Sequence, residues 1–328
     1  MPLLVATDRE VVVLDVKRGG GVPVQGIGSG PTCLSGDPLV PGRVCCGTHR
    51  DGVFRSNDGG SSWRSVGLAG RRITAISASP VQPGVVWVGT EPSEVWRSAN
   101  AGTDWVQTSD LETLSSSSEW SFPPRPDTHH VRWIACHPLE AERLWVAIEA
   151  GALVSTIDGG RTWSDRVPSG PWDTHELAIH PKAPNTLRVS GGDGYFESTD
   201  GGATWRSPRA GLEVGYLRSV VIDPEDADVV VVSASSAPHS AYVPGRSDGR
   251  LYRRVQHGRW ERVRTGWPEP PSTIAPLLCA GGRAGELWAA DERGVHRSDD
   301  SGNSWRRAAS YPTTPRQLRG LAVVTRGP

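Results

Sequence analysis

The segment Ser198-Thr-Asp200-Gly-Gly202-Ala-Thr-Trp205 occurs five times in this chain, with small changes. The other copies run from Ser56 to Trp63, Ser98 to Trp105, Thr156 to Trp163 and Ser298 to Trp305. All share the pattern Ser/Thr-x-Asp/Asn-x-Gly-x-x-Trp. Aspartate and asparagine accept hydrogen bonds from nearby backbone amides, and glycine adopts the positive φ that a tight reversal needs. The pattern therefore predicts a recurring hairpin turn whose tryptophan opens the next strand.

The spacing of the copies indicates how the strands are grouped. Trp105 follows Trp63 by 42 residues, and Trp205 follows Trp163 by the same interval. This period is typical of four-stranded propeller blades. The interval from Trp105 to Trp163 is 58 residues, which indicates an insertion, and a degenerate copy ends at Trp260. Six blades are thus recognisable from their turns.

Seven short apolar segments are expected to form the innermost strands: 32–34, 73–76, 131–134, 174–177, 217–220, 274–277 and 318–323. The last has no chain after it to finish a blade, whereas the N-terminal strands 3–6 and 11–14 lack an inner strand. Pairing the two ends would close the ring and remove exposed sheet edges. We therefore predict an all-β chain that forms a single domain over 1–328, a seven-bladed β-propeller of four-stranded antiparallel blades. The seventh blade would combine residues 1–25 and 316–328.

The repeated octapeptide resembles the Asp-box, or bacterial neuraminidase repeat, of sialidases, sortilin-type receptors and photosystem assembly-factor propellers. In those proteins each copy marks one propeller blade. The resemblance implies that the aspartates of the boxes serve the fold rather than catalysis. For function it implies either a sialidase-like enzyme or a non-catalytic scaffold.

Composition narrows the classes of partner. The 328 residues carry a formal net charge of −1, so no basic field indicates a nucleic-acid or membrane partner. The N-terminal residues lack the pattern of a secretory leader, which predicts a cytoplasmic protein. Five scattered cysteines without CxxC spacing are typical of buried thiols in a reducing compartment.

Two insertions, residues 107–130 and 234–249, are predicted to lie at the end of the channel where the inner strands start. Long loops in a compact domain are more often functional than idle. Arginine side chains at equivalent inner-strand positions would hold a carboxylate or phosphate there, unless they pair with carboxylates of neighbouring blades. The predicted ligand-binding residues are Arg132, Arg218, Arg319, Trp120, Trp172 and Tyr242.

The same end of the ring gathers residues suited to acid–base chemistry. We predict His175, Glu176, Asp173 and Glu149 as catalytic residues, with Glu149 and Glu176 as the carboxylate pair of a glycosidase. Histidines near a carboxylate also suit a divalent metal such as Zn, Mn, Fe or Ca. The candidate ligands are His129, His175 and His239, and the alternative is that these side chains bond to backbone in a wet channel. No nucleotide cofactor is expected.

The sequence leaves two functions open. The first is a sialidase-like or other carbohydrate-active enzyme, of glycosidase or lyase type, acting on a small polar or anionic ligand with or without a metal. The second is a scaffold that binds a protein partner without catalysis. Fold alone does not decide between them.

Overall fold

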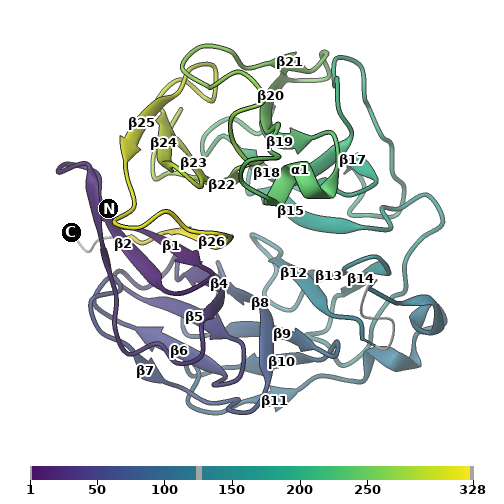
Figure 1. The fold of residues 1–328 in the computed structure, drawn as a ribbon. Helices are drawn as coiled ribbons and strands as arrows, with labels where there is room; N and C mark the ends of the chain where they lie inside the picture. The colour runs from purple at the N-terminus through teal and green to yellow at the C-terminus, as the bar shows by residue number, and fades with distance from the viewer. Residues whose placement is uncertain (1, 123–127, 326–328) are drawn as a thin grey trace.

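The computed structural model describes residues 2–122 and 128–325. Within them, seven antiparallel sheets surround a central axis as blades (Figure 1). The innermost strands are β4 (Pro31–Gly36), β8 (Arg72–Ala78), β12 (Val131–Cys136), β15 (Thr174–His180), β18 (Tyr216–Ile222), β22 (Leu277–Ala280) and β26 (Leu318–Val323). The chain is therefore the seven-bladed β-propeller that its repeats predict.

The remaining strands continue outward in each sheet. Second strands are β1 (Leu3–Thr7), β5 (Val44–Thr48), β9 (Val86–Glu91), β13 (Leu144–Ile148), β16 (Ala183–Gly191), β19 (Val229–Ser235) and β23 (Leu287–Asp291). Third strands are β2 (Val11–Asp15), β6 (Val53–Ser56), β10 (Val95–Ser98), β14 (Ala152–Thr156), β17 (Gly194–Ser198), β20 (Arg250–Val255) and β24 (Gly294–Ser298). Outer strands are β3 (Gly20–Pro23), β7 (Arg64–Ser65), β11 (Val106–Gln107), β21 (Glu261–Arg262) and β25 (Arg306–Ala309).

Two sheets, β12–β14 and β15–β17, have three strands in the described chain, and the other five have four. In these two sheets single bridges, Ser155–Ser164 and Glu197–Arg206, stand where a fourth strand would pair. Pro168 and Pro208 follow the bridges within a few residues. Proline has no N–H to donate to a ladder, so neither residue can extend the pairing.

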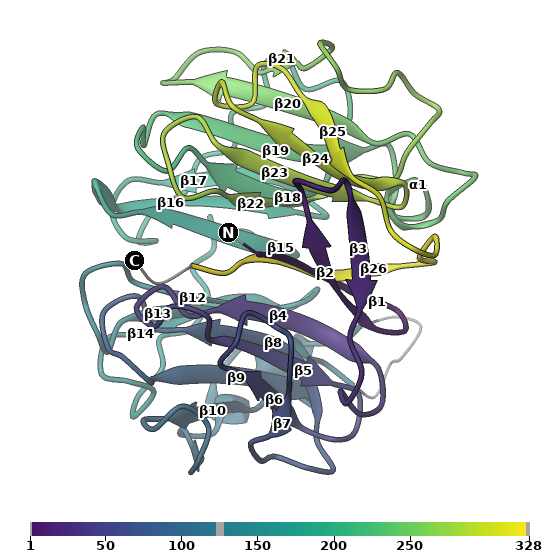
Figure 2. The ribbon, with the colours of Figure 1, turned by 90° about the vertical axis from the view of Figure 1, so that its left-hand side faces the viewer.

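The ring closes between the two ends of the chain, as predicted. Strand β26 pairs antiparallel with β1, with Leu3 opposite Val323 and Val5 opposite Leu321. The resulting sheet has the order β26-β1-β2-β3, and Figures 1 and 2 show the two termini beside each other at this blade. The seventh blade is thus assembled from both ends.

Each repeated octapeptide forms the turn between a third strand and the chain that follows it. In the fourth copy the Ser198 hydroxyl donates to Asp200 Oδ1 over 2.7 Å and accepts from the Gly202 amide over 2.8 Å. Gly202 has a φ of +95°, and the Trp205 indole N–H donates to its carbonyl over 2.9 Å. The side chains of the box are therefore used within the turn itself.

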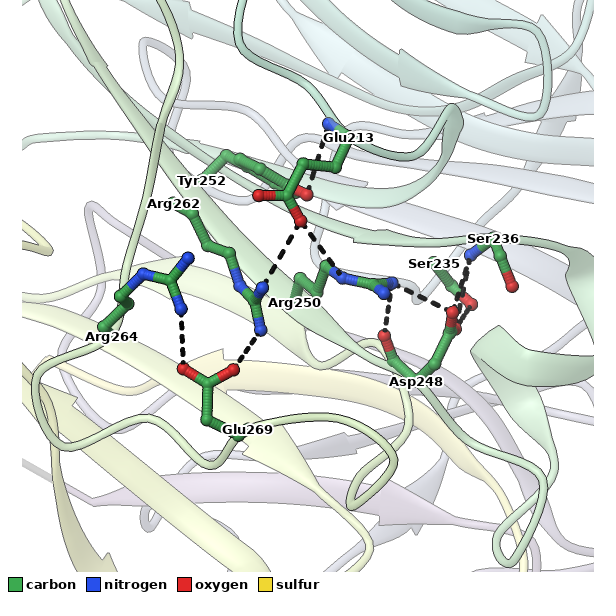
Figure 3. Close-up of polar contacts among 9 residues, drawn as sticks. All are labelled: Glu213, Ser235, Ser236, Asp248, Arg250, Tyr252, Arg262, Arg264 and Glu269. Carbon is green, nitrogen blue, oxygen red and sulfur yellow. Dashed lines mark hydrogen bonds and ion pairs between the residues drawn. The ribbon is translucent and has the colours of Figure 1, made fainter.

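The insertion at 234–249 contains a short helix, α1 (Pro238–Tyr242), which lies at the end of the ring opposite the two termini (Figure 2). We call this end, where β12, β15 and β18 begin, the insertion end. Figure 3 shows how the base of the insertion is fixed: Asp248 accepts from the Ser235 hydroxyl and from Arg250. Arg250 also faces Glu213, which links it to an outer ion-pair network.

The insertion also shifts the inner strand of the next blade. The sequence predicts this strand over 274–277, but β22 begins at Leu277. The Ala275 amide donates instead to the Ala241 carbonyl of α1 over 3.2 Å, and Pro276 has no amide to donate. Residues 273–275 therefore hold the insertion rather than the blade.

The insertion at 107–130 has two single-turn 3-10 helices, Leu111–Thr113 and Ser117–Glu119. Residues 123–127 of this predicted insertion lie outside the described chain. In the rest of the fold, all five cysteines are free thiols, and burial raises the pKa of Cys33 and Cys45 to about 12. No helix among the described residues is long and apolar enough to span a bilayer.

Candidate functional site

Three side chains from two neighbouring blades converge at the insertion end. Glu149 follows β13 directly, and Asp173 and His175 lie at the start of β15. One ligand-type atom from each of the three lies within 4.8 Å of the other two. Because inner strands begin and second strands end at the same edge of antiparallel blades, residues far apart in sequence meet here.

Glu149 is held as an anion by two basic neighbours. His130 Nε2 lies 2.6 Å from Glu149 Oε2, and Arg132 Nε lies 3.7 Å from the same oxygen. Burial by itself would raise the pKa of Glu149, but Arg132 and His130 outweigh it and lower the pKa to about 2. The Glu149 carboxylate is therefore charged, with its Oε2 atom occupied and Oε1 facing the site.

His175 is oriented by the neighbouring blade. Its Nδ1 lies 2.6 Å from the Leu217 carbonyl oxygen, and a carbonyl can only accept, so Nδ1 carries the proton. Nε2 then faces Asp173 Oδ2 at 3.7 Å and Glu149 Oε1 at 4.0 Å. Only 1% of the side chain is exposed, and burial lowers its pKa. The ring is thus a neutral acceptor directed at two carboxylates.

Asp173 contributes the second carboxylate. Its Oδ1 accepts from the Ala150 amide over 3.0 Å, which leaves Oδ2 for His175. Burial raises the pKa of Asp173, and the negative charge of Glu149 adds to the increase, although His175 opposes it. Two nearby carboxylates thus have pKa values shifted in opposite directions.

Two tyrosines form the side of the site next to the 234–249 insertion. The Tyr216 hydroxyl lies 3.4 Å from His175 Nε2 and 3.4 Å from the Tyr242 hydroxyl. Arg132 Nη2 lies 3.5 Å from the Tyr242 hydroxyl. The insertion therefore supplies a polar group to the site through Tyr242, one of the residues predicted to bind ligand.

The three predicted ligand-binding arginines differ in their surroundings. Arg132 lies at the site, with 28% of its side chain exposed. Arg218 is buried and donates to the Ala275 and Leu318 carbonyls over 2.7 and 2.8 Å, so it joins inner strands. Arg319 is exposed on β26 and donates to the Gln317 side chain. Of the three, only Arg132 contacts the carboxylates at the site.

The predicted aromatic residues also separate. Trp172, directly before Asp173, is 48% exposed, and its amide donates to Asp193 over 2.9 Å. Trp120 is buried between two blades, and its indole N–H donates to the Ser116 hydroxyl over 3.0 Å. Trp172 is thus available to a ligand, whereas Trp120 packs the base of its insertion.

Glu176 does not share the position of the other acidic residues. It is buried and accepts hydrogen bonds from the Ser219 hydroxyl and the Val220 amide of the next blade. Burial raises its pKa to about 8, so the carboxyl carries a proton at neutral pH. Glu176 therefore joins β15 to β18, and Asp173 rather than Glu176 is the carboxylate that faces Glu149.

The histidines predicted as metal ligands are not brought together. His129 Nε2 lies 3.9 Å from Glu112, and its ring packs edge-on against Trp120. His239 is exposed on α1. Among the described residues, the one group of three with converging ligand atoms is Glu149, Asp173 and His175, so His175 alone remains from the predicted metal set.

Sequence reasoning missed Tyr216 as a site residue and gave His129 the place that His130 takes. Tyr216 is the first residue of β18, as Thr174 is of β15. The start of each inner strand was the available signal, because that position faces the insertion end in every blade. For His129 and His130, adjacent in sequence, nothing in the pattern decides which ring turns inward.

No protein-family model and no curated protein matches the chain. Among solved structures it is similar to the GH74 enzyme of Niastella koreensis, at 15% identity and a TM-score of 0.70, over 94% of this chain and 52% of that one. It is also similar to the GH74 xyloglucanase of Xanthomonas campestris, at 15% identity and a TM-score of 0.69, over 99% and 52%. The chain thus spans about half the length of these enzymes.

A third similar structure is YCF48 bound to D1 peptide, at 18% identity and a TM-score of 0.59, over 84% of this chain and 81% of that one. These two groups of structures share the propeller fold with this chain. At such low identity the similarity extends to the fold and not to activity, which has to be argued from the site.

Proposed function

We propose that the insertion end is the active site of an enzyme acting on a small polar, carbohydrate-like ligand. The observation that carries this proposal is the convergence of Glu149, Asp173 and His175, whose ligand-type atoms, one from each residue, lie within 4.8 Å of one another. If these side chains served only the fold, their buried polar atoms would be expected to hydrogen-bond to one another or to nearby donors. Here the separations of 3.7 and 4.0 Å are longer than hydrogen bonds, so the three groups converge without bonding directly to one another.

The surrounding groups favour a ligand with hydroxyl or carboxylate groups. Arg132, Tyr216 and Tyr242 offer hydrogen-bond donors on one side. Trp172 offers an exposed aromatic face next to Asp173. A few convergent polar groups beside an aromatic surface are typical of small-molecule sites, and a sugar or sugar acid presents matching hydroxyls and an apolar ring face.

The chemistry proposed is cleavage of a glycosidic or similar bond by hydrolysis or elimination. Glycoside cleavage uses two carboxyl groups, about 5–5.5 Å apart in retaining enzymes. One oxygen of Glu149 and one of Asp173 lie within 4.8 Å of each other, and His175 Nε2 is an acceptor for a proton from water or a ligand hydroxyl. The similarity to GH74 structures supports a carbohydrate as the first class of substrate to test.

The test is turnover of a panel of aryl glycosides, including uronides and sialosides, and of xyloglucan oligosaccharides. Glu149→Gln and Asp173→Asn should each lower kcat/KM by about 10²–10⁴-fold, the usual contribution of one acid–base group. Glu112→Gln is the matched control, because Glu112 lies at the same end with 64% of its side chain exposed and should leave turnover unchanged. Equal activity in all three variants would refute the proposal.

A second function, protein binding without catalysis, has one observation in its favour. The similar structure of YCF48 with D1 peptide matches this chain over 81% of its own length, so the two propellers are of comparable size. This alternative predicts no turnover on any substrate of the panel. It also predicts capture of a peptide that is retained by Glu149→Gln and Asp173→Asn.

A further inference from the structure

We infer that Glu149, Asp173 and His175 together hold one divalent transition-metal ion, of which Zn²⁺ and Mn²⁺ are the two to test, at the insertion end of the propeller. The inference deepens the proposed function, on which its catalytic consequence rests, but binding of the ion itself requires no turnover. One imidazole nitrogen and two carboxylate oxygens form a donor set that suits these cations.

The distances between the three donor atoms fit a shared ion better than they fit direct contacts. Nε2 of His175 lies 3.7 Å from Asp173 Oδ2 and 4.0 Å from Glu149 Oε1. Hydrogen bonds in proteins are shorter than about 3.2 Å. Atoms bound about 2 Å from one ion are themselves separated by roughly 3–4 Å. Small rotations of the two carboxylates would therefore complete the site.

The atoms that do not face the site are held by groups outside it. His175 Nδ1 donates to the Leu217 carbonyl over 2.6 Å, and Asp173 Oδ1 accepts from the Ala150 amide over 3.0 Å. Glu149 Oε2 lies 2.6 Å from His130 Nε2. Metal-binding residues are oriented in this way by a second shell, and a histidine ligand regularly donates its other ring N–H to a carbonyl. Each residue thus directs one atom into the site, and these three atoms face one another; the Tyr216 hydroxyl lies 3.4 Å from the His175 atom, Nε2.

The charges at the site also favour a bound cation. Glu149 and Asp173 bring two carboxylates within 4.8 Å of each other beside a buried imidazole. Arg132 compensates one of them, but it lies against Glu149 Oε2, 3.7 Å away, and not against Oε1. Like charges at this separation repel each other, and a cation between them relieves that repulsion. A divalent ion among Oε1, Oδ2 and Nε2 would balance the remaining negative charge.

Three protein ligands leave at least one coordination position for water or for a ligand oxygen. The Tyr216 hydroxyl lies 3.4 Å from His175 Nε2, on the side of the site next to the 234–249 insertion. A bound ion of this kind lowers the pKa of its water toward neutrality and polarises a bound oxygen. With the ion bound, these residues would serve hydrolysis by holding it; without the ion, they have the proton-transfer roles proposed above.

The experiment uses the full chain without an affinity tag, dialysed against a chelator and then against chelator-free buffer. Titration with ZnCl₂ and with MnCl₂, followed by calorimetry and by elemental analysis after gel filtration, should give one ion per chain. His175→Ala and Asp173→Asn should each weaken binding at least tenfold. His239→Ala is the matched control, because His239 is exposed on α1 and should bind as the unmodified chain does. Circular dichroism establishes that each variant is folded, and His175→Gln replaces His175→Ala if the latter is not.

The inference is overturned if neither metal binds more tightly than about 1 mM, or if binding survives both site substitutions. Binding that is lost in His239→Ala would also overturn it, because the metal would then lie on the surface. Stoichiometric binding without turnover would leave the metal site standing and refute the proposed enzyme. Turnover by metal-free protein that binds neither ion would support the proposed enzyme and refute the metal site.

Discussion

Closure of the ring depends on the last strand of the chain, and removing it should destabilise the whole propeller. The perturbation is a chain that ends at residue 316, which lacks β26 and the residues after it. Strand β1 would lose the partner that pairs with it from Leu3 to Thr7. In repeat architectures each unit is stabilised by its neighbours, so the damage should not stay local.

The magnitude follows from what the segment buries. Leu318 and Val324 are 4% and 1% exposed, and burying such side chains contributes about 1.5–3 kcal/mol each. The segment also provides backbone partners to Asp8, Pro2 and Gly42, each worth about 0.5–1.5 kcal/mol. The sum is on the order of 5–10 kcal/mol, which is comparable with the whole stability of a typical domain, about 5–15 kcal/mol.

The assay is thermal and urea unfolding followed by circular dichroism, beside a control chain that ends at residue 325 and keeps β26. We expect the chain ending at 316 to be unfolded at 37 °C, or to melt at least about 10 °C below the control, since one kcal/mol shifts Tm by a few degrees in domains of this size. If both chains melt within two degrees of each other, the pairing of β26 with β1 is not what stabilises the ring.

Two further predictions concern the repeated turns. Ser298→Ala leaves the buried Gly302 amide without the hydroxyl that accepts from it over 2.8 Å, and should lower the free energy of unfolding by about 1–3 kcal/mol. The control, Ser304→Ala, removes an exposed hydrogen bond and should change the free energy of unfolding little. Equal losses in urea titration would contradict the structural role given to the Ser298 hydroxyl. Hydrogen bonds, first of all from the Ser62 hydroxyl, outweigh the opposing effect of burial and lower the pKa of Asp58 to about 2. Because the folded-state pKa lies below the unfolded value of about 3.9, this carboxylate stabilises the fold above pH 4 and loses that effect as the pH falls toward 2. Asp58→Asn should therefore reduce the loss of stability between pH 4 and pH 2, and unfolding curves with the same pH slope as the unmodified chain would show the reasoning to be wrong.

The fold was predictable because its signal is repeated and local. Each octapeptide needs only its own residues to form a turn, as the Ser198 and Asp200 bonds illustrate. Closure was predictable from counting, since an unmatched strand at each end has few other partners. The repeats do not predict where an individual blade differs from the others. The fourth strands after Trp163 and Trp205 shorten to single bridges although their boxes are intact.

The site was only partly predictable, because its residues come from different blades and no local pattern links them. Sequence position placed Glu149, Asp173 and His175 at the insertion end. It also placed Glu176 there, although its side chain turns to Ser219 of the next blade. Which way adjacent side chains turn depends on the local twist and on a register shift between Thr174 and Glu176, and neither is visible in composition or spacing.

Arg218 connects the closure of the ring to the candidate site. Its guanidinium donates to the Leu318 carbonyl of β26 and the Ala275 carbonyl beside the insertion, and it lies 4.5 Å from the centre of the Tyr242 ring. A planar cation over an aromatic face holds that ring in place. The Tyr242 hydroxyl in turn lies near Tyr216 and Arg132. Arg218 therefore links the strand that closes the propeller to the insertion that supplies Tyr242 to the site.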